Sequence, residues 1–267
     1  MQIAFSTLIQ ELYKYAKNRQ FQRAVVGLSG GLNSSLALLM AVRSFGAKNV
    51  TALLLPEIGL TPADEIAHAK ALATHLGVAI HHQPINNFLV DYNFVHWDKT
   101  EEANENLKAR IRANLLTLFA ESNHALLIGT ADHSGLQLGL GTPDGEFIGA
   151  LHPFGDLYKT DLIRLAEILE LPEELTKTPF SRHLKPNQTD AEDMGAPWEK
   201  VDEILRALDD FADQQTLIDK GANPLLVHRL ARLKEQNLPL QNLFTIIPVS
   251  TRTLSIKKAR EAEAKSA

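Results

Sequence analysis

The stretch VVGLSGGLNSSLALLMAV, residues 25–42, joins a strand pattern to a helix pattern through a glycine turn. A β-branched apolar run leads into Ser29-Gly30-Gly31, and apolar residues at helical spacing follow. Two glycines let backbone N–H groups approach phosphate oxygens closely, and the helix start adds the positive end of its dipole. Ser34 and Ser35 add hydroxyl donors to that of Ser29. The stretch predicts a phosphate-binding loop; a tight strand-to-helix turn without a ligand is the alternative.

Short apolar runs alternate with helical patterns four times over the first half of the chain. We expect strands at 24–28, 50–55, 78–81 and 125–129. We expect helices at 6–17, capped by Ser6, and at 34–45, 61–76 and 101–122, with Thr61 capping the third. Strands that are wholly apolar and β-branched favour a parallel sheet covered by helices on both faces. The predicted fold class is therefore α/β, a Rossmann-like doubly wound parallel sheet whose ligand lies beyond the carboxyl ends of the strands.

After residue 130 the pattern changes to helices and loops. Helices are expected at 159–171, 198–208 and 225–234, the glycine-rich segment 139–149 is expected to be a mobile loop, and 177–195 is expected to be irregular. We expect one domain over residues 1–249. Residues 250–267 are rich in Ala, Lys, Glu and Arg and are expected to form a flexible basic tail.

The chain has 267 residues, a net charge of −5 and no cysteine. The charge gives no sign of a general nucleic-acid surface. The absence of cysteine excludes disulfides, thiolate zinc sites, iron–sulfur clusters and cysteine nucleophiles. The first residues show no signal-peptide pattern, and no apolar run approaches the length of a membrane span. We expect a cytoplasmic protein with no nucleic-acid or membrane partner.

The phosphate loop lacks the lysine of the G-x-x-x-x-G-K-[ST] loop and the spacing of G-x-G-x-x-G. It resembles instead the S-G-G-x-D-S loop of the ATP pyrophosphatases, which cleave ATP between the α and β phosphates and adenylate an acid. Further segments occur in an order that looks like ammonia-dependent NAD synthetase: NLKARIR (106–112), LLIGTADHS (126–134), PFGDLYKTDLIRLAEILELPEEL (153–175), KTP (177–179) and QTDAEDMG (188–195). GDLYKT and QTD are the most specific of these, and the resemblance covers roughly residues 20–210.

This resemblance implies that ATP adenylates the nicotinate carboxylate of deamido-NAD, and that ammonia then displaces AMP and leaves NAD. It also implies ATP and Mg²⁺ as cofactors, a symmetric homodimer, and free ammonia as the nitrogen donor, because the chain is too short for a fused glutaminase domain. The long helix at 101–122 would contribute to the dimer interface. Its apolar positions could equally belong to the core of their own chain: Leu107, Ile111, Leu115, Leu118 and Phe119.

The resemblance also implies roles for individual residues. Those assigned to the ATP or pyrophosphate site are Ser29, Gly30, Gly31, Ser34, Ser35, Arg110, Thr130 and Lys159. Lys159 and Asn33 are the candidate catalytic residues, and Asp190 and Lys108 are the candidate dinucleotide contacts. Three alternatives remain open: a solvated lysine at 159, a surface arginine at 110, and a helix cap at Asp190.

Four features depart from the family pattern. The loop aspartate that holds magnesium in the family is Asn33 here, and the second metal acid is Gly135, so no metal ligand is assigned. An acid expected near Ala150 and two bases expected at Thr245 and Ile246 are also missing. The candidate replacements for the metal acids are Asp132, Asp144 and Glu146.

These departures leave three hypotheses open. The chain is an NAD synthetase with a degenerate metal site and reduced or altered activity, a related ligase that adenylates a different acid, or a catalytically silent paralogue that binds nucleotide. We expect adenine nucleotide binding to survive and amidation of deamido-NAD to be weak or absent. Binding needs the loop, whereas amidation needs magnesium fixed against the departing pyrophosphate.

Overall fold

The computed structural model, which describes residues 2–181 and 189–249, contains a sheet of four parallel strands. They are β1 (Arg23–Gly27), β2 (Val50–Leu54), β3 (Ala79–His82) and β4 (Ala125–Ile128), in the order β3-β2-β1-β4. Val26 of β1 lies beside Ala52 on one side and Ile128 on the other. The central position of β1 brings the loop after it to the carboxyl edge of the sheet, between the ends of β2 and β4.

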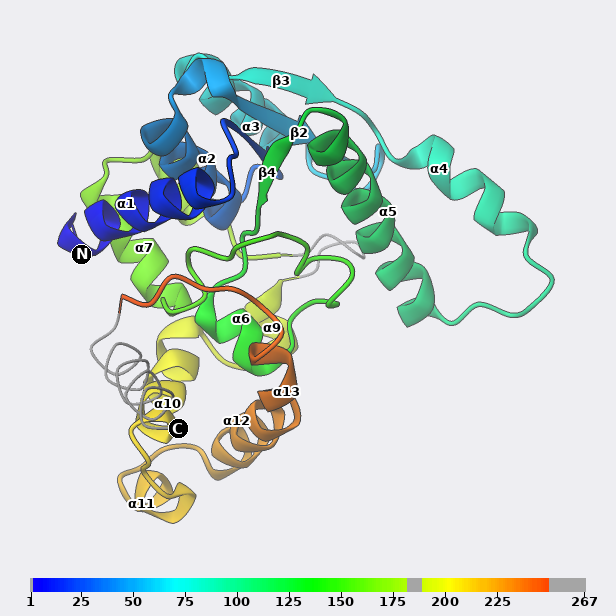
Figure 1. Ribbon diagram of the computed structural model, residues 1–267. Coiled ribbons are helices and arrows are strands. Elements are labelled where there is room, and N and C mark those ends of the chain that lie inside the picture. The colour runs from blue at the N-terminus through cyan, green and yellow to red at the C-terminus, as the bar shows by residue number, and fades with distance from the viewer. Residues whose placement is uncertain (1, 182–188, 250–267) are drawn as a thin grey trace, which may run out of the picture.

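Helices cover both faces of the sheet (Figure 1). On one face lie α1 (Gln2–Asn18), α2 (Leu32–Phe45), α3 (Ala63–His75), α7 (Lys159–Ile168) and α8 (Glu173–Lys177). On the other face α5 (Glu101–Ser122) packs Ile111 and Leu116 against Val25 and Leu127. Neighbouring strand residues point to opposite faces, so Val26 belongs to the first core and Val25 to the second. The prediction of a doubly wound α/β sheet is confirmed.

A further group of helices follows the sheet in the chain (Figure 1). Its members are α6 (His133–Leu138), α9 (Asp190–Met194), α10 (Trp198–Asp209), α11 (Gln214–Asp219), α12 (Pro224–Gln236) and α13 (Leu238–Gln241). Trp198, Val201 and Leu230 lie in an apolar cluster of their own. Because α10 and α6 also contact α7, this cluster adjoins the sheet core. The single domain over residues 1–249 stays a prediction.

Two predicted helix starts are wrong. The first helix begins at Gln2, not Ser6, because the apolar spacing already begins at Phe5, which is buried with Leu8 and Leu12 on one face of α1. The third begins at Ala63, and Thr61 does not cap it; the Thr61 hydroxyl accepts a hydrogen bond from Glu57 N instead. By contrast, α5 spans 101–122 as predicted and begins at a Thr100 cap. The remaining boundaries agree with the prediction to within three residues.

Other predictions concern the loops and the end of the chain. Segment 139–149 forms neither helix nor strand, and its mobility stays a prediction. The predicted tail at 250–267 lies outside the described residues, as does Gln188 of the QTD segment. No helix in the described part of the chain is long and apolar enough to cross a bilayer.

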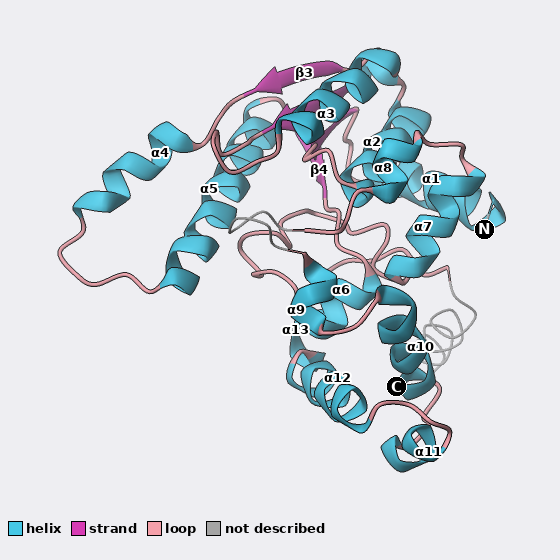
Figure 2. Cartoon of the chain, turned by 180° about the vertical axis from the view of Figure 1, so that it is seen from behind, coloured by secondary structure: helices cyan, strands magenta, loops and turns pink. Residues whose placement is uncertain are grey.

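An arm formed by residues 86–100 precedes α5. It contains α4 (Asn86–Val90) and the short 3-10 helix η2 (Asp91–Phe94), and it projects from the body of the chain in both views (Figures 1 and 2). Leu89 packs against the core beside α5, but five large apolar side chains of the arm are exposed, with Phe94 at 74% and Trp97 at 69% exposure. Exposed aromatic residues gathered on one projecting element are typical of an interaction surface.

Candidate functional site

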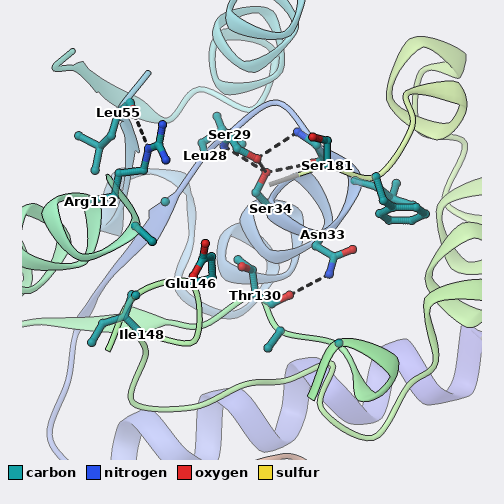
Figure 3. A pocket seen from close by; sticks show the side chains of 18 of the residues that line it. Leu28, Ser29, Asn33, Ser34, Leu55, Arg112, Thr130, Glu146, Ile148 and Ser181 are labelled. Atoms are coloured by element: carbon teal, nitrogen blue, oxygen red, sulfur yellow. Dashed lines mark hydrogen bonds between the residues drawn. The ribbon is translucent and has the colours of Figure 1, made fainter. Parts of the chain in front are cut away.

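A cavity of about 270 Å³ lies at the carboxyl ends of β1, β2 and β4, where a parallel sheet of this kind binds ligands (Figure 3). The residues after β1 form one wall, and the end of β2 with one face of α5 forms another. Segments 130–132 and 145–148, Lys159 and Asp190 complete it. The wall under α5 is mainly apolar, while the side of the phosphate loop is polar.

The phosphate loop is held closed by its own serines (Figure 3). Ser34 Oγ accepts a hydrogen bond from Ser29 N and donates to Gly31 O, and Ser35 Oγ donates to the same carbonyl. Gly31 N donates to Ser29 Oγ. Gly30 has a φ of 96°, and a Cβ there would lie 2.4 Å from Glu65 O, so only glycine fits. The loop is therefore shaped before any ligand arrives.

Most of the predicted site residues line this cavity. Those that do so are Ser29, Gly31, Asn33, Ser34, Thr130, Gly135, Lys159 and Asp190. Gly30 and Ser35 shape the loop without lining the cavity. Arg110 pairs with exposed Asp144 at 2.7 Å and Lys108 with Glu57 at 2.8 Å, and neither Lys108 nor Arg110 lines the cavity. The placement of Arg110 matches the surface alternative.

Asn33, Asp132 and Lys159 form a chain of contacts at the polar end of the cavity. Asn33 Nδ2 donates to Thr130 O at 3.0 Å (Figure 3). It also donates to Asp132 Oδ2 at 2.8 Å. Lys159 Nζ donates to the same Asp132 Oδ2 at 2.9 Å, and Gly135 N donates to Asp132 Oδ1 at 2.8 Å. Burial opposes ionisation of Asp132, but the Lys159 charge and the donated hydrogen bonds outweigh it and lower the pKa of this carboxyl. Asp132 is thus a buried, ionised partner of Lys159.

Lys159 is buried at the start of α7, with 5% of its surface exposed, so the alternative of a solvated lysine is wrong. Its ammonium lies 3.9 Å from Asp190 Oδ2, 4.2 Å from the centre of the Phe180 ring and 4.7 Å from that of Trp198. The helix-cap alternative for Asp190 is also wrong, because the Thr189 side chain caps α9. Acid and aromatic faces together favour a charged ammonium at this position.

The start of α7 is fixed by Asp202, a buried residue of α10 that the sequence analysis missed. Asp202 accepts hydrogen bonds from Ser134 Oγ at 2.6 Å and Thr160 N at 2.7 Å, and Ser134 Oγ accepts one from Lys159 N. Burial raises the pKa of Asp202, and these hydrogen bonds oppose the shift. Two backbone N–H groups of the first turn of α7 therefore find acceptors, which sets the position of Lys159.

Arg112 is the second missed residue. It lines the cavity and donates from Nε to Leu55 O at 3.0 Å (Figure 3). Burial lowers the pKa of its guanidinium, and the charges of Glu57 and Glu146 oppose that shift. Helical spacing contained the signal, because Ala109, Ala113 and Leu116 define the inward face of α5 and position 112 lies on it, whereas 108 and 110 do not.

Glu146 faces the same cavity from the segment 145–148 (Figure 3). Its Oε2 accepts from Thr142 N at 3.0 Å, while its Oε1 is buried with no hydrogen-bond partner among the described residues. Of the three candidate replacement acids, Asp132 and Glu146 line the cavity and Asp144 does not.

Known proteins resemble this chain over most of its length. The model of the NAD synthase family matches residues 4–238. The chain belongs to the NAD synthase family. An NH(3)-dependent NAD(+) synthetase of Methanocaldococcus jannaschii is 34% identical over 223 residues, covering 82% of this chain and 80% of the relative.

Solved structures agree with this family membership. An NH3-dependent NAD synthetase of Campylobacter jejuni, solved in complex with the nitrate ion, superposes with a TM-score of 0.75 at 27% identity, covering 93% of this chain and 98% of the other. An NMN synthetase from Francisella tularensis superposes with a TM-score of 0.77 at 21% identity, covering 94% and 98%, and shows the shared fold.

The substrate-side departures from the NAD synthase pattern lie apart from the cavity. Ala150 is exposed and its N donates to Leu127 O at 2.9 Å. Thr245 is exposed, and its carbonyl accepts from His152 N at 2.8 Å. Ile246 forms an isolated bridge with His152. None of the three lines the cavity.

Proposed function

We propose that this chain is an ATP-dependent carbon–nitrogen ligase of the NAD synthetase type, with a degenerate metal site and slow amidation. A nicotinate carboxylate oxygen attacks the α-phosphorus of ATP and pyrophosphate leaves; ammonia then attacks the acyl carbon and AMP leaves. The observation that carries the proposal is the cavity at the strand ends, which combines the phosphate loop with the buried cation Lys159 in a member of the NAD synthase family.

In this proposal the chain acts by positioning and by charge. Ser29, Gly31 and Ser34 place N–H and hydroxyl groups near the positive end of the α2 dipole, where departing pyrophosphate would accumulate charge. These groups would exchange their hydrogen bonds within the loop for hydrogen bonds to phosphate oxygens. Lys159 provides a fixed positive charge, and Arg112 a second one under α5. The apolar wall beneath α5 suits the base of a nucleotide.

Magnesium does not fit this site as an ion held by carboxylates of the chain. Asn33 turns its Nδ2 toward two acceptors and so presents only a neutral amide oxygen, and Gly135 has no side chain. The described residues contain no group of three or more His, Cys, Asp or Glu side chains placed to hold a metal ion. A loosely placed Mg²⁺–ATP is expected to cost on the order of 100-fold in rate.

A second candidate is a ligase that adenylates a different acid. The supporting observation is that exposed Ala150 and Thr245 carry no charge where the family pattern has an acid and a base. Such a change would alter the acid recognised and leave the ATP side intact. Nicotinate mononucleotide is the first alternative substrate to assay.

A turnover assay tests both candidates. Purified protein receives ATP, Mg²⁺, ammonium and either deamido-NAD or nicotinate mononucleotide, with the M. jannaschii relative assayed beside it. We expect deamido-NAD amidation on the order of 100-fold below that of the relative. Rapid turnover would contradict the degenerate metal site. Nucleotide binding without amide product from either acid would favour the silent paralogue, and absence of nucleotide binding would contradict all three functions.

Lys159→Ala is expected to weaken ATP binding. Removing one charged partner of phosphate costs about 1.5–3 kcal/mol, or roughly tenfold or more in Kd. Isothermal titration calorimetry with ATP measures this, and Lys200→Ala is the control because Lys200 forms an ion pair outside the cavity. An unchanged ATP affinity in Lys159→Ala would contradict the assigned contact.

We also propose that the chain forms a homodimer through the arm. Within α5, Ile111 is buried, and Leu107, Leu115 and Phe119 pack on their own core, so the intrachain alternative is correct for these four. Leu118 is 62% exposed. The arm adds the exposed apolar side chains Phe88, Val90, Tyr92, Phe94 and Trp97. Contact between two copies would cover these side chains.

The double change Phe94→Ser with Trp97→Ser is expected to weaken the dimer. Aromatic anchors at the centre of an interface contribute about 2 kcal/mol or more each. One such anchor corresponds to a rise of about 30-fold in dimer Kd, so the double variant should exceed that rise. Light scattering after size-exclusion chromatography measures the mass. Phe211→Ser is the control, since Phe211 is 91% exposed but lies outside the arm. A monomeric parent protein would contradict the proposed dimer.

A further inference from the structure

The Asp132 carboxylate lies between residues 33 and 135, the two positions at which the family resemblance implies metal acids. Its Oδ2 accepts from Asn33 Nδ2, and its Oδ1 accepts from Gly135 N. A Cβ built on Gly135 would lie 3.4 Å from Asp132 Oδ1. The Asp132 carboxylate, three residues before Gly135 in the chain, therefore occupies the space between positions 33 and 135.

Lys159 supplies the positive charge that balances the Asp132 carboxylate. The ammonium donates to the same Oδ2 that accepts from Asn33, and both side chains of the ion pair are almost fully buried, at 6% and 2% exposure. Together with the bond from Gly135 N, three of the roughly four acceptor positions of Asp132 are occupied. Little of this carboxylate remains to bind a cation.

The orientation of Asn33 follows from the same arrangement. Its Nδ2 faces the Thr130 carbonyl and the Asp132 carboxylate, both of which accept hydrogen bonds only. An aspartate at position 33 would direct a carboxylate at these acceptors and at a like charge, which disfavours its ionised form. Asn33 and Asp132 are therefore a matched pair, in which the amide suits the neighbouring charge.

We propose that the Lys159 ammonium, held by Asp132, takes the place of a divalent cation bound by the chain in this cavity. The proposal rests on the proposed function for the identity of the cavity, and it concerns a property that is measured without turnover. The site carries a tethered monovalent cation, so the chain itself binds no divalent ion there. Removing the ammonium takes away the cation that favours the ionised form of Asp132. A divalent ion could then take its place beside Asp132 and the buried Asn33 Oδ1, which has no hydrogen-bond partner among the described residues.

Mn²⁺ binding to the nucleotide-free protein, followed by electron paramagnetic resonance, tests the proposal. The parent protein is expected to bind Mn²⁺ only weakly at millimolar concentrations. Lys159→Met is expected to bind it at least about tenfold more tightly, because the positive ammonium that repels Mn²⁺ from the carboxylate is gone. Asp132→Asn with Lys159→Met should lose that gain. Lys200→Met is the control, because it removes a lysine from a 2.9 Å ion pair outside the cavity.

Lys159→Gln covers the case in which the methionine variant does not fold, since the glutamine amide can still donate to Asp132. Circular dichroism establishes which variants are folded. Tight Mn²⁺ binding by the parent protein, or no gain in a folded Lys159→Met or Lys159→Gln variant, would overturn the tethered-cation proposal. ATP calorimetry on the parent protein separates the outcomes: loss of ATP binding there contradicts the proposed function, whatever the Mn²⁺ result.

Discussion

Asp132→Ala is expected to lower the free energy of unfolding by about 3–5 kcal/mol, because removing one partner leaves the other charge buried and uncompensated. Lys159 is 5% exposed, and its nearest carboxylate oxygen in the described structure is Asp132 Oδ2 at 2.9 Å. The variant also removes the side chain that caps α6 through Gly135 N, which contributes about 1 kcal/mol. Asp190 at 3.9 Å retains part of the compensation, so the lower half of the range is expected.

The double variant Asp132→Ala with Lys159→Met isolates the charge. It removes both members of the pair, so we expect a higher free energy of unfolding than in Asp132→Ala alone, although the lost cap remains. Urea denaturation at one protein concentration measures all variants, since a dimer would make stability depend on concentration. A single variant within about 1 kcal/mol of the parent would show that Lys159 is solvated or neutral.

The layout of the sheet could be predicted because it depends on local patterns. Wholly apolar β-branched runs placed all four described strands, and helical spacing predicted the bounds of α5, whose start the structure marks with a Thr100 cap. The failed caps at Ser6 and Thr61 have a common cause. A hydroxyl residue caps a helix only if the helix does not extend further toward the N-terminus and no other donor engages the hydroxyl. The helix already includes Phe5, so Ser6 is not its cap, and Glu57 N engages the Thr61 hydroxyl.

The candidate site could be predicted only in part. The phosphate loop is contiguous in the chain, so its lining residues Ser29, Gly31 and Ser34 could be found from sequence. Arg112 was missed because Arg110 was chosen from a motif rather than from the inward face defined by Ala109 and Ala113. Identifying which charged residue of a helix faces the cavity requires the neighbouring apolar positions as well as the motif.

Long-range polar contacts could not be predicted. Lys159 lies 27 residues from Asp132, and Asp202 lies 68 residues from Ser134, yet both pairs form direct hydrogen bonds. No periodicity or spacing links such residues, because the sheet and α10 bring them together. The sequence revealed that the family's metal acids are missing at 33 and 135. Only the structure shows that the Asp132–Lys159 pair occupies the space between these two positions.

His152 is expected to make the protein unstable in acid. Its side chain is fully buried, and its Nδ1 accepts a hydrogen bond from Ala131 N at 3.3 Å. The ring packs so closely on Gly129 that a Cβ there would lie 2.3 Å from His152 Cε1. Burial lowers the pKa of His152 from 6.5 to about 4, because the interior disfavours the charged imidazolium.

The direction of the pH dependence follows from these two pKa values. Above pH 6.5 the ring is neutral in both states, so its contribution to stability is fully present. Between pH 6.5 and about 4 the unfolded chain binds a proton that the native protein does not, so the free energy of unfolding falls with decreasing pH. The difference between these two pKa values corresponds to a loss of about 3 kcal/mol in the free energy of unfolding, complete once the pH is below both values.

His152→Gln separates this effect from the titration of other groups. Glutamine does not titrate and can still offer an acceptor to Ala131 N. It will lower stability at pH 7.5 through altered packing, so the informative quantity is the difference between parent and variant, followed by urea denaturation from pH 7.5 to 4. The free energy of unfolding of the parent protein, relative to that of the variant, is expected to fall by about 3 kcal/mol between pH 7.5 and 4. A difference that stays constant across this range would mean that His152 titrates near 6.5 in the native protein, and that the ring reaches water despite its burial.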